Sequence, residues 1–330
     1  MTSGRKRVIV KTTARLHLGF IDLHGGLGRR YGSLGIAINQ PRCVLEVQQS
    51  DSGISVAEEG EHRIRKLAKE FIEYFRYSGG LQITTREVIP EHDGLGSGTQ
   101  LSLAVGSSIA TLMGKPVNAR ELANIAGRGV ISGIGTAVFT KGGFVIDAGH
   151  PAANGLTDHK PIAQYIPPSI VHHSVPKGWV FIVAIPNIQR GLSGEKELMA
   201  FNHLQAAKPE HARKISRVVL MQLLPALVED NISLFGKALT TIQTLVGDAF
   251  AEAQGGRFAD PIVASCIEAM LNSGAHGAGQ SSWGPTCYGL VRGASQIKAV
   301  QKAAKAAIDT TGGYVFAAQV NNQGAQITKK

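Results

Sequence analysis

The sequence has few cysteines, few aromatic residues and no long apolar run, and each shortage excludes a class of protein. Its three cysteines, Cys43, Cys266 and Cys287, are widely spaced and odd in number, so they predict neither a disulfide framework nor a CxxC metal pair. No stretch reaches the roughly 18 consecutive apolar residues of a membrane span. The basic start MTSGRKRVIVKTTARL has an apolar stretch too short for a signal peptide, and it resembles an opening strand. We therefore expect a cytoplasmic protein with no membrane partner.

Aromatic residues make up only 6% of the chain, although its formal net charge is +10. A positive charge suits nucleic acid, anionic lipid or a polyphosphate ligand. Proteins that bind single-stranded nucleic acid combine basic grooves with aromatic rings. Here the Lys and Arg residues are spread along the chain, and the densest run, HRIRKLAKEFIEYFR, also contains acidic residues. We predict an anionic small substrate and no nucleic-acid partner; an RNA-binding protein is the alternative that the charge favours.

The length of the chain predicts two domains in contact. It has 330 residues, 43% of them hydrophobic, which exceeds the usual size of one core. The stretch from Pro151 to Pro176 is rich in Pro, His and turn residues and marks a boundary. Strands precede and follow helices without strict alternation, which predicts an α+β fold with domains at 1–165 and 166–330.

Local patterns predict individual elements of the first half. The stretch EHRIRKLAKEFIEYFRYS, residues 61–78, places apolar residues at helical spacing. An apolar helix is expected from about Thr99 to Met113. AVFTKGGFVIDAG, residues 137–149, is predicted to be a hairpin with Gly142 and Gly143 at its turn.

The stretch ARLHLGFIDLHGGLGRRYGSLGIAI, residues 14–38, places charged residues among glycines between two apolar runs. Such a concentration of charge suggests a ligand site. Two structural alternatives stay open: Asp22 and Arg29 form an ion pair within a glycine-rich turn, and His17 is a hydrogen-bonded core histidine.

The loop GLGSGTQ, residues 94–100, lies between a predicted strand and a predicted helix. Glycines let a backbone turn tightly and approach an anion, and the N–H groups at a helix start favour negative charge. No GK[ST] follows, so the loop is not a P-loop. Ser97 and Thr99 are expected to cap the helix, and the loop geometry suits a diphosphate.

Three motifs resemble the GHMP kinase superfamily. They are the pattern P-x3-GLGSG-T at 90–99, SGIGTAVFTKGGFVID at 132–147 and SGAHGAGQSSWGPTCYGLV at 273–291. The resemblance implies an N-terminal domain of the ribosomal-S5-domain-2 type and a ferredoxin-like C-terminal domain. It also implies an active site in the cleft between them. A GHMP-type ATP-dependent small-molecule kinase is accordingly one alternative function.

One position departs from the kinase pattern. Kinases of the mevalonate type carry Asp where this chain has Gly135, and that carboxylate is the base for, or orients, the attacking hydroxyl. Glycine can do neither. The departure argues against phosphoryl transfer.

A narrower resemblance is to the β-ribofuranosylaminobenzene 5′-phosphate synthase family. It rests on the segment at 14–38 together with EHDGLGSGTQLSLAVGSSIA and RGVISGIGTAVFTKGGFVIDAGH. The family transfers phosphoribose from 5-phosphoribosyl 1-diphosphate (PRPP) to 4-aminobenzoate or 4-hydroxybenzoate and releases CO2 and diphosphate, in tetrahydromethanopterin biosynthesis. The resemblance also suggests a homodimer. The reaction needs an anion cradle and positioning but no base for a C–H bond.

The resemblance implies roles for five residues of the opening segment. Arg29 or Arg30 is expected to bind the benzoate carboxylate or a PRPP phosphate, because guanidinium binds both bidentately. Asp22 is expected to stabilise developing positive charge or to hold Mg2+. Arg15 and His17 alternate along a strand that leads into the site, so both are expected to face one side. The residues expected to be catalytic are Asp22, Arg29, Arg15 and His17.

The remaining predicted site residues bind phosphate or the metal. Mg2+ is expected with PRPP, and no organic cofactor is expected. The predicted metal ligands are Asp22 and Thr99, with Ser97 as the alternative to Thr99. The predicted substrate-binding residues of the loop are Gly94, Gly96, Ser97, Gly98, Thr99 and Gln100, and those elsewhere are Lys141, Gly277, Gly279 and Gln280.

Overall fold

The computed structural model describes residues 5–57, 61–152, 164–191, 197, 199–201 and 208–330. The first half contains two sheets, with strand orders β14-β1-β4-β6-β5 and β2-β3-β7-β9; β8 pairs with β3. Their strands are β1 (Arg7–Lys11), β2 (Ala14–Asp22), β3 (Arg29–Ile38), β4 (Val44–Ser50), β5 (Ile54–Ala57), β6 (Gly80–Glu87), β7 (Phe144–Asp147), β8 (His150–Pro151), β9 (Ser169–His173) and β14 (Gln326–Lys329).

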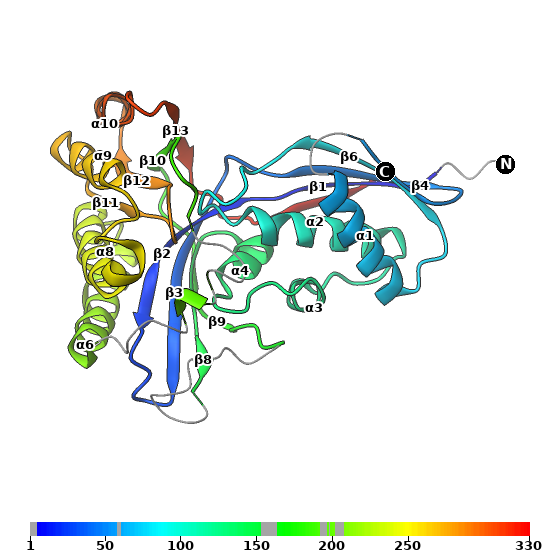
Figure 1. Ribbon diagram of the computed structural model, residues 1–330, viewed down its shortest axis with the longest axis horizontal. Helices are drawn as coiled ribbons and strands as arrows, with labels where there is room; N and C mark the ends of the chain where they lie inside the picture. The colour runs from blue at the N-terminus through cyan, green and yellow to red at the C-terminus, as the bar shows by residue number, and fades with distance from the viewer. Residues whose placement is uncertain (1–4, 58–60, 153–163, 192–196, 198, 202–207) are drawn as a thin grey trace.

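Of the four helices of the first half, the first two pack below the sheet that contains β1, β4 and β6 (Figure 1), and the fourth packs against β2, β3 and β7. The first helix buries Ile64, Leu67, Ala68, Phe71 and Phe75 on one face, which is the spacing that the sequence predicts. These helices are α1 (Glu61–Phe75), α2 (Ser97–Leu112), α3 (Ala119–Ile125) and α4 (Ile134–Lys141).

The prediction of a hairpin at 137–149 is wrong for its first strand, because residues 134–141 form the helix α4 instead. Ile134 and Val138 are one helical turn apart, and both are buried against Val145 of β7. Gly142 ends the helix with a positive φ of 65°. The apolar run therefore packs with helical periodicity instead of strand alternation.

The second half is built on one antiparallel sheet of order β11-β12-β10-β13. This order, with helices connecting β10 to β11 and β12 to β13, is the ferredoxin-like arrangement. Its elements are β10 (Trp179–Pro186), α6 (Pro209–Val218), the π-helical segment η2 (Val219–Leu223), α7 (Leu224–Val228), α8 (Ile232–Gln254), α9 (Pro261–Asn272), β11 (Gly277–Gln280), β12 (Cys287–Arg292), α10 (Ala294–Ala307) and β13 (Gly313–Gln319).

Strand pairing does not follow the expected boundary at 165/166. β9 pairs with β7 of the first half, and β14 at the end of the chain pairs with β1. The last strand therefore returns to the N-terminal sheet, so the two halves are joined by two chain crossings in place of one.

The β2–β3 hairpin runs outward from the junction of the halves and lies beside α8 (Figure 1). A bulge between His17 and Gly19 shifts its register. Gly19 has a φ of 121°, a backbone conformation that glycine adopts readily. Arg15 therefore lies at the junction, whereas Asp22 lies at the outer end.

The contact between α8 and β11 depends on two glycines. A Cβ on Gly236 of α8 would collide with the carbonyl oxygen of His276, and a Cβ on Gly277 would collide with the carbonyl oxygen of Gly236. Backbone atoms cannot move aside as a side chain can. The glycines thus let the helix and the strand approach to backbone contact.

We predict that Gly236→Ala lowers the free energy of unfolding by about 2 kcal/mol or more, because the collision outweighs the ~1 kcal/mol by which alanine favours a helix. Denaturant unfolding followed by circular dichroism measures the change. Gly256→Ala is the control, since its Cβ would meet only the Phe258 carbonyl oxygen at 3.5 Å. An unchanged or more stable Gly236→Ala would contradict the contact.

Candidate active site

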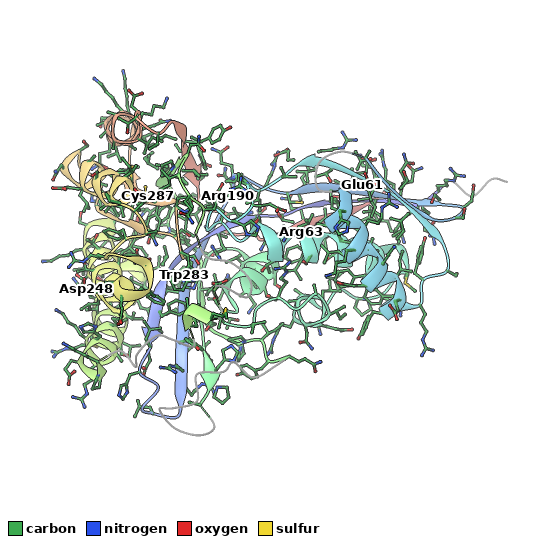
Figure 2. All side chains as sticks on the ribbon, viewed as in Figure 1. Glu61, Arg63, Arg190, Asp248, Trp283 and Cys287 are labelled. Atoms are coloured by element: carbon green, nitrogen blue, oxygen red, sulfur yellow. The ribbon has the colours of Figure 1, made fainter. Side chains whose placement is uncertain are left out.

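A cavity of about 420 Å³ lies between the two halves of the protein. Figure 2 shows Arg63 on the first half and Trp283 on the second, and both line it. The other lining residues are Arg15, Glu91, His92, Gly94, Gly96, Ser97, Gly98, Thr99, Arg128, Glu197, Ser282 and Gly284. The predicted phosphate loop therefore faces the cleft between the domains.

The N-terminus of α2 opens into this cavity without a side-chain cap. Gly96 is the N-cap residue, with a left-handed φ of 81°, and among the residues that the structure describes no side chain caps the first turn. The prediction that Ser97 and Thr99 cap the helix is wrong; both lie inside the first turn and line the cavity. The first N–H groups of a helix have no partner within the helix, so they are available to an anion.

Three arginines surround this helix start. A Cβ on Gly96 would lie 3.1 Å from Cγ of Arg15. A Cβ on Gly98 would lie 2.7 Å from Nη2 of Arg63 and 3.1 Å from Nη1 of Arg128. Glycine at these two positions lets guanidinium groups approach the backbone N–H groups, so both kinds of donor face one anion.

The three arginines are half-buried. Burial lowers the pKa of Arg15 to about 10 and also lowers the pKa of Arg128, to which the nearby charge of Arg63 contributes. The buried Nε of Arg128 has no hydrogen-bond partner within the described part of the chain. Arg63 forms an ion pair with Glu91. An anion with several oxygens would satisfy the donors that the protein leaves unpaired.

The Ser281 hydroxyl, from the second half of the chain, forms hydrogen bonds with the phosphate loop and with β2 of the first half. It donates a hydrogen bond to the Gly94 carbonyl oxygen at 2.7 Å and accepts one from the His17 N–H at 2.9 Å. The Arg15 guanidinium also donates to the Gly94 carbonyl oxygen. A Cβ on Gly94 would collide with the Ser281 carbonyl oxygen, so glycine is required at this contact.

A second cavity of about 210 Å³ adjoins the first. The lining residues that it does not share with the first cavity are His17, Phe20, Gly127, Gly129, Val130, Ile131 and Ser132, so polar and apolar groups both contribute. The two cavities share their remaining lining residues, which are Arg15, Thr99, Arg128, Glu197 and Ser282. A flat ring in the smaller cavity would therefore meet an anion held in the larger one.

His17 lines the smaller cavity as an uncharged imidazole. Its Nδ1 accepts a hydrogen bond from the Gly19 N–H at 3.3 Å, which leaves the proton on Nε2. Burial, with a smaller contribution from the positive charge of Arg15, lowers the pKa of His17 to about 3. His17 is therefore both a buried, hydrogen-bonded histidine and a residue that lines the candidate site. Its Nε2–H group is an uncharged hydrogen-bond donor.

Glu197 is an acidic residue that lines both cavities. Its Oε1 accepts a hydrogen bond from Nε1 of Trp283 at 3.1 Å. Burial raises the pKa of Glu197, while Arg15 opposes that rise. The sequence analysis did not single out this residue.

Gly135 lies directly behind Thr99. A Cβ at position 135 would lie 3.1–3.3 Å from three atoms of the Thr99 side chain, so an aspartate there would displace it. The Gly135 carbonyl oxygen accepts a hydrogen bond of 2.8 Å from Nε2 of Gln100. Gln100 is a fully buried residue of α2 whose side chain bonds to α4, so its predicted contact with substrate does not fit its position.

Asp22, Arg29 and Arg30 lie away from both cavities, at the outer end of the β2–β3 hairpin. At about 3.3 Å per residue, Asp22 is roughly 20 Å along β2 from Arg15. Oδ1 of Asp22 accepts hydrogen bonds from the N–H groups of His24 and Gly25. We expected Asp22, Arg29 and Arg30 to lie in one site with the phosphate loop. This distance shows that they do not.

The hairpin arginines bind backbone carbonyl groups. Arg29 donates to the Ala148 and Gly149 carbonyl oxygens, and Arg30 donates to that of Leu23. No ion pair joins Asp22 to Arg29 in the described ranges. The alternative interpretation, in which Asp22 and Arg29 form a structural ion pair, is therefore not supported. The binding roles expected for Asp22, Arg29 and Arg30 stay predictions.

The second-tier candidates also lie outside both cavities. Lys141 is exposed at the C-terminal end of α4. Gly277 and Gly279 are buried against α8, where a Cβ on Gly279 would collide with the Gln243 side chain. The Gln280 side chain accepts from the Ala259 N–H and donates to the Ser282 carbonyl oxygen. The positions of Gly277, Gly279 and Gln280 are explained by packing and internal hydrogen bonds.

The described residues contain no group of three or more His, Cys, Asp and Glu side chains that is able to hold a metal ion. The predicted pair of metal ligands, Asp22 and Thr99, is separated by most of the length of β2. No helix among the described segments is long and apolar enough to cross a membrane.

Known proteins share these sequence features. The GHMP kinases N terminal domain matches residues 62–143, and the GHMP kinases C terminal domain matches residues 223–309. A beta-ribofuranosylphenol 5′-phosphate synthase of Methanothermobacter thermautotrophicus is 36% identical over 86% of this chain and 88% of its own length. Another, of Methanocaldococcus jannaschii, is 33% identical over 97% of this chain and 100% of its own length. The chain belongs to the beta-ribofuranosylphenol 5′-phosphate synthase family.

Membership of this family confirms the resemblance on which the sequence analysis relied, and it confirms that the chain is an enzyme. The crystal structure of a homoserine kinase from Cytophaga hutchinsonii covers 99% of both chains with a TM-score of 0.69 at 19% identity. That likeness shows the fold and confirms the predicted α+β architecture. Kinases are thus distant relatives that share the scaffold.

Arg63, Arg128 and Glu197 are among the residues of the cavity that were not predicted as site residues. Arg128 had one usable signal, because it stands between two glycines just before the SGIG motif. Arg63 lies within an ordinary amphipathic helix, and Glu197 has no neighbouring motif. Both reach the cavity only through the packing of distant segments.

We predict that Arg128→Gln weakens the binding of inorganic pyrophosphate at least ten-fold, because a buried cationic donor is lost. Titration calorimetry measures the affinity at fixed salt. Arg213→Gln, which changes an exposed arginine of α6, is the control for net charge. Equal affinity of the two variants would exclude Arg128 from the anion site.

A pH dependence follows from His17. Since its folded pKa of about 3 lies below the ordinary value of 6.5, the unfolded chain binds the proton first and stability falls as the pH drops below 6.5. At pH 5 this costs about 2 kcal/mol. The destabilisation caused by His17→Gln should therefore be about 2 kcal/mol smaller at pH 5 than at pH 7.5. Denaturant unfolding at both values measures it, and a pH-independent difference would contradict a neutral His17.

Proposed function

We propose that the protein transfers the phosphoribosyl group of PRPP to the ring carbon of 4-hydroxybenzoate that carries the carboxylate, with release of CO2 and diphosphate. The product would be β-ribofuranosylphenol 5′-phosphate, the compound for which the curated relatives are named. 4-Aminobenzoate is the second acceptor under consideration. The observation that carries this proposal is a cavity lined by three arginines and the start of α2, joined to a smaller one that Phe20 and Ile131 line in part.

The larger cavity suits the diphosphate of the donor. The start of α2 and the three arginines supply N–H donors and positive charge where the leaving group gains negative charge. Arg63 and Arg128 face Gly98 from two sides. Diphosphate is thus stabilised more as it departs than while it is still bonded to the ribose.

The smaller cavity suits the aromatic acid. Phe20 and Ile131 offer apolar surface, and Nε2–H of His17 is a neutral donor. Arg15 and Arg128, which border both cavities, are the cations within reach of its carboxylate. The C–O bond to diphosphate breaks, the ring carbon forms the C–C bond with the ribosyl carbon, and the electrons of the bond to CO2 restore aromaticity.

Mg2+ fits this site as an ion carried by the donor. Magnesium commonly binds substrate phosphates and water with only one or two protein oxygens. Thr99 lines the cavity, and its hydroxyl is the candidate protein ligand, whereas Asp22 is at the hairpin end. When bound, the ion would neutralise part of the diphosphate charge.

Incubation with Mg2+ and carboxyl-labelled 4-hydroxybenzoate tests the function. Labelled CO2 is expected only when PRPP is present, and ATP is not expected to replace it. The same assay with labelled 4-aminobenzoate ranks the two acceptors by kcat/KM. Phosphorylation of homoserine from ATP, without release of CO2, would instead establish the kinase alternative.

A further inference from the structure

Glu197 occupies the border between the two cavities. It lines both of them, as do Arg15, Thr99, Arg128 and Ser282. Glu91, another carboxylate in the larger cavity, is neutralised by its ion pair with Arg63. Glu197 is therefore the carboxylate that the described residues place where an anion in one cavity meets a ring in the other.

The side chain of Glu197 is held in place. Trp283 donates its indole N–H to Oε1, and the indole ring packs edge-on against Phe201 and Phe250 at centroid distances of 5.5 and 4.9 Å. A carboxylate fixed by a buried indole keeps its position while charge develops nearby. Such preorganisation is what makes electrostatic stabilisation effective.

We propose that Glu197 stabilises the positive charge that develops on the ribosyl carbon of PRPP as the diphosphate leaves. This inference rests on the proposed function, which requires that carbon to lie between the diphosphate and the aromatic ring. The attacked ring carbon bears a carboxylate and no hydrogen. Glu197 is therefore not needed as a base that removes a ring proton. A negative charge at the border stabilises the cationic transition state and repels the anionic donor in the ground state.

The second role open to Glu197 is to accept the hydroxyl proton of 4-hydroxybenzoate. That role predicts a dependence on the acceptor, since the amine of 4-aminobenzoate delocalises the positive charge without losing a proton. Stabilisation of the ribosyl carbon predicts equal losses with both acceptors. Comparison of the two acceptors therefore separates the two roles.

The test is Glu197→Gln, which keeps the size of the side chain and an oxygen for the Trp283 N–H. We expect kcat to fall about 100-fold with both acceptors. The affinity for PRPP, measured by titration calorimetry without acceptor, should stay the same or become tighter, because a negative charge is removed beside an anion. Glu252→Gln on the exposed side of α8 removes the same charge at a distance and should keep the wild-type kcat.

Each other outcome has a definite meaning. Full activity of Glu197→Gln would overturn this inference alone, as would weaker PRPP binding with kcat unchanged. A loss confined to 4-hydroxybenzoate would assign Glu197 to the hydroxyl proton and overturn the role at the ribosyl carbon. A wild-type protein that releases no CO2 would remove the proposed function together with this inference.

Discussion

The cavity depends on the hydrogen bonds of the Ser281 hydroxyl, which hold the phosphate loop at the junction of the two halves. Ser281 lies in the second half of the chain, and its partners, Gly94 and His17, lie in the first. A glycine at position 94 is needed because the backbone of residue 281 leaves no room for a Cβ. This contact places the start of α2 in the cleft with its first N–H groups facing inward. Without it, the arginines and the helix start would not face one ligand.

The same scaffold supports kinases, and the difference lies in a few side chains around the loop. Gly135 removes the carboxylate that the kinase pattern carries, and Thr99 fills the space in front of it. Arg63 and Arg128 converge on Gly98, and Glu197 faces them from the other half of the chain. This arrangement of charge suits the proposed transfer, in which an anion departs while positive charge develops on the ribosyl carbon.

The β2–β3 hairpin carries the most distinctive sequence segment, yet its charged end lies outside both cavities. Asp22 organises the turn through backbone N–H groups, while Arg29 binds carbonyl groups of the segment before β8. Arg15 and His17, at the inner end of the same strand, reach the cavities. A single strand therefore connects the junction of the halves to an outer, glycine-rich turn.

The sequence by itself determined the family, the two-domain α+β architecture and the phosphate loop, because these depend on local patterns: a glycine turn before an apolar helix, and helical or alternating spacing of apolar residues. It did not determine the cap of α2 or the helix at 134–141, where packing against Val145 decided between two periodicities. Only the tertiary structure brought Arg63, Arg128 and Glu197 together, and only it separated Asp22 from Thr99. The physical reason is that a site is made by side chains distant in sequence, and their distances depend on how strands of fixed length and close glycine contacts pack.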